Sequence, residues 1–85
     1  MSMDIDYIVK IRENIRNTLI ELRVEHNLTQ TDVGNIVGKS KNAVASWEQG
    51  LSCPDAVTLH RLAAYYHKTL DYMYGEKNGG GKDEV

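Results

Sequence analysis

The middle third of the chain holds a dense series of residues that end and start helices, and this series restricts the fold more than any other feature. Thr29 can cap a helix, and Asp32 follows it at the spacing of a capping box. Gly38 can adopt the left-handed backbone that ends a helix, and Ser40 can cap a new helix two residues later. The series predicts a short helix from Gln30 to about Val37, followed across a tight turn by another.

The second of these helices is expected to run from about Lys41 to Gln49 and to end at Gly50. Its helical spacing turns Val44 and Trp47 toward the core, and Glu48 lies on the same inward side. We therefore interpret Trp47 as a core anchor.

Two more helices are indicated downstream. Pro54 disfavours helix before it, and Asp55 can cap a helix after it that continues to about Tyr66. Thr69 can cap a last short turn that contains Met73. Tyr66 has the spacing of a core residue.

A long aliphatic stripe precedes these short helices. Apolar side chains recur at three- and four-residue steps from Ile8 to Leu22, which predicts one amphipathic helix from about Asp6 to His26 or Asn27. The amino end adds Ile5 and Val9 to this stripe. Residues 1–14 are therefore treated as an amino-terminal helical extension, which either lengthens the helix over the same core or pairs with a partner.

Length and charge narrow the range of functions. The 85 residues suffice for one modest hydrophobic core, which predicts a single domain. The net charge of -2 argues against a protein that coats nucleic acid by bulk attraction. The segment from Tyr7 to Gly75 nevertheless holds eight Lys or Arg against seven Asp or Glu, a net of +1. Any binding must therefore come from local patches.

The remaining composition indicates no other kind of site. The single cysteine, Cys53, cannot form an internal disulfide, and the sequence contains no leader-like or membrane-length apolar segment. A cytoplasmic location is therefore expected, without a membrane. His26, His60 and His67 lack the paired spacing of zinc ligands, so no metal is expected. No nucleophile and base, phosphate loop or cofactor motif is found, and the chain is predicted not to be an enzyme.

Residues 28–50, LTQTDVGNIVGKSKNAVASWEQG, resemble the helix-turn-helix core of the Cro and lambda-repressor family, also called the XRE family. The marks are Thr-Gln at the first motif helix, a small residue at Gly34, the turn at Gly38 and the Trp-Glu-x-Gly ending. The resemblance extends from about Ile15 to Gly75. It implies an all-α fold, a compact five-helix bundle with an extended first helix. The lambda-repressor-like DNA-binding domain would occupy residues 15–75, and residues 76–85 would form a flexible tail.

The resemblance also implies a function. The chain is expected to bind specific double-stranded DNA as a transcriptional regulator that acts as a repressor, with the helix at about 41–49 in the major groove. Lys41, Asn42 and Ser46 fall on positions that usually read bases in this family, and Gln30 on one that usually contacts a phosphate. The full set of expected DNA-binding residues is Thr29, Gln30, Lys39, Ser40, Lys41, Asn42, Ala43, Ser46 and Gln49.

The residues themselves agree with this assignment. Helical spacing leaves Lys39, Asn42, Ser46 and Gln49 facing away from the core, with Lys41 at the helix start. Amides can pair with adenine and a lysine can donate to guanine, while the short side chain of Ala43 permits a close approach to the bases.

Two other features are interpreted as structural. Gly34 lacks a side chain where the two motif helices are expected to cross, so they can pack closely. Arg23 and Glu48 carry opposite charges, and the inward side of Glu48 suggests a partly buried salt bridge between the first and third helices.

Partners remain open on the sequence alone. Family habit and the tyrosines near the carboxyl end favour a homodimer on a palindromic operator, and no small-molecule effector is evident. The loop Leu51-Ser52-Cys53 lacks the Lys or Arg that the family often carries there, which predicts weaker phosphate affinity. The acidic net charge favours an alternative, a protein-interaction module such as an antitoxin or anti-repressor on the same fold. The outward Lys39 and Lys41 oppose this alternative.

Overall fold

Five helices make up the described part of the chain. The computed structural model describes the backbone of residues 2–76 and the side chains of residues 5–76. The helices are α1 (Ser2–Glu25), α2 (Gln30–Val37), α3 (Lys41–Gln49), α4 (Ala56–Tyr65) and α5 (Leu70–Met73), with no strand among these residues. The predicted all-α class is confirmed. The tail predicted at residues 76–85 lies, apart from Glu76, outside the described residues.

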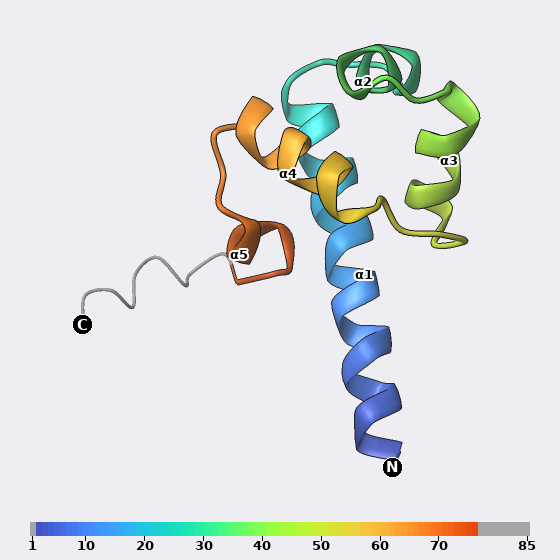
Figure 1. The fold of residues 1–85 in the computed structure, drawn as a ribbon, viewed down its shortest axis with the longest axis vertical. Coiled ribbons are helices and arrows are strands. Elements are labelled where there is room, and N and C mark those ends of the chain that lie inside the picture. Colours follow the sequence, from blue (N-terminus) through green and yellow to red (C-terminus); the bar gives the residue numbers. More distant parts are fainter. Residues whose placement is uncertain (1, 77–85) are drawn as a thin grey trace, which may run out of the picture.

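The helices α2 to α5 surround the carboxyl-terminal half of α1, while the amino-terminal half of α1 extends away from them (Figure 1). The helix begins at Ser2, so the predicted start near Asp6 is wrong. No glycine or proline precedes Asp6, and therefore nothing in the sequence ends the helix there. The boundary predicted between residues 14 and 15 lies inside α1, which continues through it without a break.

The caps of α2 and α3 form as predicted. The Oγ1 of Thr29 accepts a hydrogen bond from the backbone N–H of Asp32 at 3.0 Å, and Asp32 accepts from the N–H of Thr29 at 2.8 Å. The Oγ of Ser40 accepts from the N–H of Ala43 at 3.0 Å. Gly38 ends α2 with a left-handed φ of 73°, which a residue with a Cβ adopts only at a cost. The local signals therefore set the lengths of these helices.

The last two helices also have the predicted caps. Asp55 accepts from the N–H of Thr58 at 2.8 Å, and Thr69 accepts from the N–H of Tyr72 at 3.0 Å. Between the two helices, His67 has a left-handed φ of 59°. A non-glycine residue in that region is strained, as expected for this corner.

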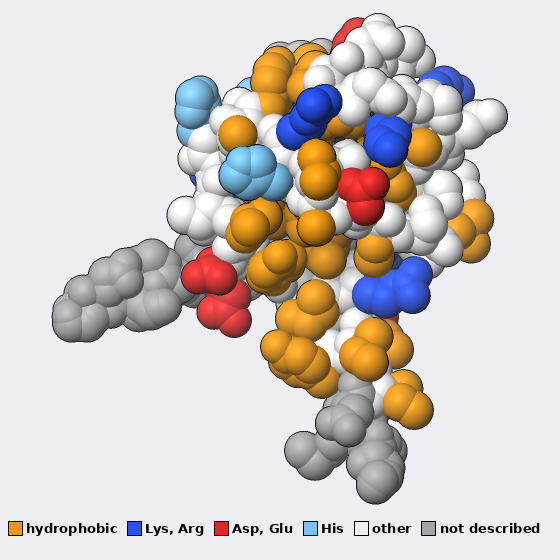
Figure 2. Space-filling model, viewed as in Figure 1, with side chains coloured by type: hydrophobic (Ala, Val, Ile, Leu, Met, Phe, Trp, Pro, Cys, Tyr) orange, Lys and Arg blue, Asp and Glu red, His pale blue; other side chains and the backbone are white. Residues whose placement is uncertain are grey.

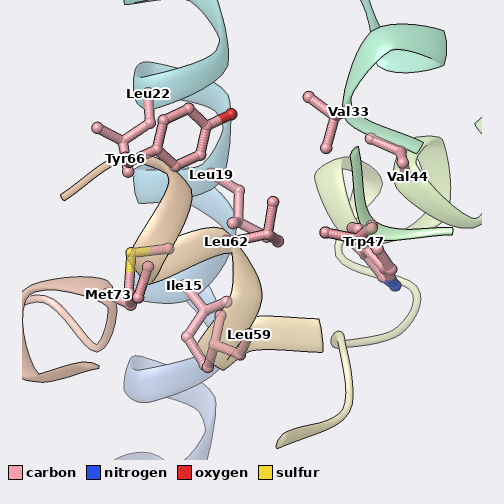
Figure 3. Close-up of a cluster of buried hydrophobic side chains, with 12 residues drawn as sticks. Ile15, Leu19, Leu22, Val33, Val44, Trp47, Leu59, Leu62, Tyr66 and Met73 are labelled. Atoms are coloured by element: carbon pink, nitrogen blue, oxygen red, sulfur yellow. The ribbon is translucent and has the colours of Figure 1, made fainter. Parts of the chain in front are cut away.

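One hydrophobic core joins the helices (Figure 3). Residues from α1 and α4 form one side of it, and α2 and α3 contribute Val33, Val44 and Trp47 from the other. Trp47 and Tyr66 are buried, which confirms the core positions inferred from helical spacing. The core consists of Ile15, Leu19, Leu22, Val33, Val37, Val44, Trp47, Leu59, Leu62, Ala63, Tyr66 and Met73. Among the described helices, none is both long and apolar enough to cross a membrane.

Candidate nucleic-acid interface

Gly34 lies in close contact with the turn between α2 and α3. The backbone N–H of Lys39 donates to the carbonyl oxygen of Gly34 at 2.8 Å. A Cβ at Gly34 would collide with the carbonyl oxygen of Lys39. A side chain is excluded at Gly34 as predicted, but the predicted neighbour is wrong, because the backbone of the turn lies there and not the opposite helix. The chain can reverse this tightly only because the side chain is missing.

The outer side of α3 is open to solvent. Lys41, Asn42 and Gln49 are exposed, whereas Val44 and Trp47 on the opposite side are buried in the core. The buried side of α3 is thus fixed by the core, and its exposed side carries one cation and two amides. Six of the nine predicted site residues are exposed, namely Thr29, Lys39, Ser40, Lys41, Asn42 and Gln49.

Gln30 is half-buried and contacts α3. Its Nε2 donates a hydrogen bond to the Oε1 of Glu48 at 3.0 Å. This hydrogen bond links the start of α2 to the last turn of α3. The amide oxygen of Gln30 takes no part in it. The amino end of α2 therefore has a defined position beside α3.

The half-buried Ser46 has a partner that sequence analysis missed. Its Oγ lies 2.8 Å from the Oγ of Ser52, and either hydroxyl can donate. The left-handed Gly50 reverses the chain, and the N–H of Leu51 donates back to the carbonyl of Ser46 at 3.0 Å. A glycine at the end of a helix often reverses the chain. This signal could have indicated that Ser52 comes back beside Ser46. Ala43 is half-buried as well, so it and Ser46 border the exposed face.

The predicted salt bridge between Arg23 and Glu48 is confirmed. The Nε of Arg23 lies 2.6 Å from one carboxylate oxygen of Glu48, and its Nη2 donates to the other at 3.0 Å. The Nη1 of Arg23 also donates to the carbonyl of Leu28 at 2.9 Å. Hydrogen bonding to Glu48 raises the pKa of Arg23, which therefore stays charged. This paired contact holds α3 against α1.

Lys39 is exposed and turns toward the start of α4. Its Nζ lies 3.8 Å from the Oδ2 of Asp55, a contact that sequence analysis did not predict. The pKa of Asp55 is lowered mainly by its hydrogen bonds with Thr58, and Lys39 adds a smaller effect. An exposed ion pair at this distance contributes little to stability. No sequence signal shows this pair, because it depends on how α4 packs behind the turn.

The structure contains two short helices joined by a tight turn. One side of the second helix packs against the core and the other side is exposed, and this arrangement defines a helix-turn-helix protein. The chain belongs to the helix-turn-helix family, whose sequence pattern matches residues 19–73. This finding confirms the resemblance to XRE-type proteins.

A curated relative makes the comparison more specific. The cryptic phage CTXphi transcriptional repressor RstR from Vibrio cholerae is 39% identical over 46 residues. The match covers 54% of this chain and 41% of the repressor, so it spans less than half of the relative's length. No solved structure matches the chain significantly.

Proposed function

We propose that this protein binds specific double-stranded DNA as a transcriptional repressor, with α3 in the major groove. The observation that carries the proposal is the two-sided character of α3, whose exposed side holds Lys41, Asn42 and Gln49. An α-helix fits the major groove, where amides pair with adenine and a lysine donates to guanine. Membership in the helix-turn-helix family and the similarity to RstR support the proposal.

The proposal divides the nine site residues into two groups. Thr29, Gln30 and Ser40 lie at the starts of α2 and α3, where the helix dipole attracts anions, and Lys39 adds a cation from the turn between the two helices. We assign these residues to the phosphate backbone. Base contacts fall to the residues along α3, namely Lys41, Asn42, Ala43, Ser46 and Gln49.

The proposed repressor acts as a homodimer on a palindromic operator, because two helix-turn-helix units with two-fold symmetry fit two symmetric half-sites. It works in the cytoplasm of a bacterium, as a bacterial or phage protein. Neither a small-molecule effector nor an enzymatic reaction forms part of the proposal.

Selection of bound fragments from a randomised double-stranded library, at low salt, tests this proposal. Major-groove reading by α3 should enrich one motif, and a homodimer should enrich it as an inverted repeat. A library that yields no enriched motif contradicts specific DNA binding. A single unrepeated motif contradicts the dimer on DNA but not the base reading.

A protein-interaction module is the second candidate, favoured by the exposed Leu51 next to α3. Leu51 is 71% exposed and lies in the loop in which the family often carries a Lys or Arg for phosphate contact. A gel-shift assay with random genomic fragments at low salt separates the candidates. Retarded fragments support the repressor, whereas no retardation at any protein concentration supports the interaction module.

A further inference from the structure

Two arginines of α1 lie beside the carboxyl end of α3. Arg12 and Arg16 are four residues apart, so they share one side of α1. Together with Gly50, which ends α3, they line a cleft of about 290 Å³. The Cδ of Arg16 lies 3.5 Å, and its Nε 4.0 Å, from the position that a Cβ on Gly50 would take. The side of α1 that carries both arginines therefore faces the end of the helix proposed to enter the major groove.

Both arginine side chains are available to a ligand. Arg12 is exposed and Arg16 is half-buried. Among the described side chains, neither guanidinium lies within ion-pair distance of a carboxylate. Figure 2 shows basic atoms at this level of α1, where the helix emerges below the others. Glu13 also lines the cleft, and two arginines against one glutamate leave a net charge of +1 there. The cleft thus has an excess of positive charge in a protein whose net charge is -2.

The exposed side of α3 leads directly to this cleft. Asn42 and Gln49 lie two turns apart on that side, and Gln49 directly precedes Gly50. Helix-turn-helix proteins contact base edges with the amino-terminal residues of their second helix. A helix rises about 1.5 Å per residue, so Gly50 lies about 13 Å along the axis from Lys41, close to the roughly 12 Å width of the major groove. With Lys41 at the bases, the carboxyl end of α3 therefore reaches the edge of the groove, where the phosphates lie.

We infer that Arg12 and Arg16 form a second phosphate-contact site, at which α1 binds the DNA backbone beside the carboxyl end of α3. This inference rests on the proposed function and adds a binding element to it. Both arginines precede residues 19–73, the part of the chain that matches the helix-turn-helix family. A guanidinium can donate two parallel hydrogen bonds to phosphate oxygens. The loop Leu51-Ser52-Cys53 holds no cation, so α1 supplies the positive charge at this end of α3.

The second site gives α3 a cation near each end. Lys39 precedes the amino-terminal cap of α3, and Arg16 lies beside its carboxyl end. Phosphate contacts fix the position and orientation of a protein on the duplex but carry no sequence information directly. Arg12 and Arg16 therefore contribute to affinity and to its salt dependence, and the choice of bases stays with α3.

Titrations of the full chain with the selected operator at several salt concentrations test the second site. Arg12→Gln and Arg16→Gln each remove one charge and keep a polar side chain. Each should raise the Kd at low salt by at least about threefold and reduce the magnitude of the slope of log affinity against log salt by about 0.9 per bound copy. The double variant should reduce that magnitude by about 1.8. The preference among single-base variants of the operator should stay that of the wild type.

Lys10→Gln is the matched control. It removes the same charge from an exposed position of α1, but Lys10 lies about 200° around the helix from Arg12. This control should keep the wild-type slope. Arg12→Lys and Arg16→Lys keep the charge and should therefore keep most of the slope. A partly unfolded variant would lower the fraction of active protein without changing the slope, so circular dichroism and stoichiometric titration distinguish a loss of fold from a loss of contact.

Three results overturn the inference: a wild-type slope in the double variant, an equal loss of slope in Lys10→Gln, or a changed base preference with an unchanged slope. The first result would leave the two arginines to an acidic protein partner or to solvent. In all three cases the wild-type chain still binds its operator, so the proposed function stands. A folded wild-type chain that binds no DNA at low salt overturns the proposed function and the second site together.

Discussion

Glu48 accepts hydrogen bonds from two helices at once, from Arg23 of α1 and from Gln30 of α2. The side chain of Glu48 is only 8% exposed, so water has little access to this group. Removal of Glu48 or of Arg23 therefore leaves the other residue without a hydrogen bond that water replaces poorly. We expect Arg23→Ala and Glu48→Ala each to lower the free energy of unfolding by about 1–3 kcal/mol. For a domain of this size, each kcal/mol lowers Tm by about 4–8 °C.

Thermal unfolding followed by circular dichroism checks this prediction, with Glu25→Ala as the control at an exposed position of α1. The control should change stability by no more than about 0.5 kcal/mol. A Glu48→Ala variant that melts like the wild type but no longer binds DNA would show that Glu48 acts at the interface and not in the scaffold.

Lys41 and Asn42 are the exposed residues in the first turn of α3, where base contacts are proposed. Lys41→Ala and Asn42→Ala should each weaken operator binding by about 1–3 kcal/mol and relax the preference at particular base pairs. Fluorescence anisotropy with the selected operator and its single-base variants measures both effects. Lys10→Ala, an exposed lysine on α1, should keep the wild-type preference. Unchanged preference in both α3 variants would show that α3 does not read bases.

Burial raises the pKa of Tyr66 to about 12, above the ordinary value of about 10. Because the folded-state pKa is the higher one, this contribution to stability is complete below about pH 10 and is lost between about pH 10 and 12. The free energy of unfolding should therefore fall over that range. The free energy of unfolding of Tyr66→Phe should fall less steeply, whereas that of Tyr7→Phe, at an exposed position, should follow the wild type. Denaturant unfolding at several pH values measures the difference, and equal slopes in the two variants would contradict it.

At the scale of elements, the junction between α2 and α3 is the tightest point of the fold. A Cβ at Gly34 would collide with the carbonyl oxygen of Lys39, a backbone atom that cannot rotate away. Gly34→Ala should therefore destabilise the protein by about 1–3 kcal/mol, even though alanine favours helix. Asn35→Ala, at the next and exposed position of α2, should be neutral or slightly stabilising. Denaturant unfolding compares the two. A stabilising Gly34→Ala would mean that the turn opens without cost.

At the scale of the whole molecule, the net charge of -2 limits how strongly DNA can be attracted. Lys39 and Lys41 are the lysines of the proposed interface, and the loop after α3 adds no cation. Lys39, the one lysine per copy assigned to the phosphate backbone, contributes roughly -1 to the slope of log affinity against log salt. Lys39→Ala should reduce the magnitude of that slope by about 1 while leaving the base preference unchanged. Titrations at several salt concentrations measure the slope, and a slope that Lys39→Ala does not alter would remove Lys39 from the phosphate contacts.

Features that depend on neighbouring residues were determined by the sequence itself. The caps at Thr29 and Ser40 and the end of α2 at Gly38 each need only a few consecutive residues, because the hydrogen bonds involved close within one turn. Helical spacing likewise decides that Val44 and Trp47 face inward. The pattern of the helix-turn-helix family is of this local kind, which is why the fold class and the outer side of α3 were predicted.

Tertiary structure alone decided the contacts between distant segments. The pair of Lys39 and Asp55 depends on how α4 packs behind the turn. The crowding at Gly34 involves the turn and not the opposite helix. The exposure of Ile5, Ile8 and Val9 is likewise decided by where the other helices stop covering α1. Helical periodicity marks which side of α1 is apolar, but it cannot show where along the helix the other elements stop covering that side. That limit is set by the lengths and packing angles of four other helices, which no single segment of the sequence contains.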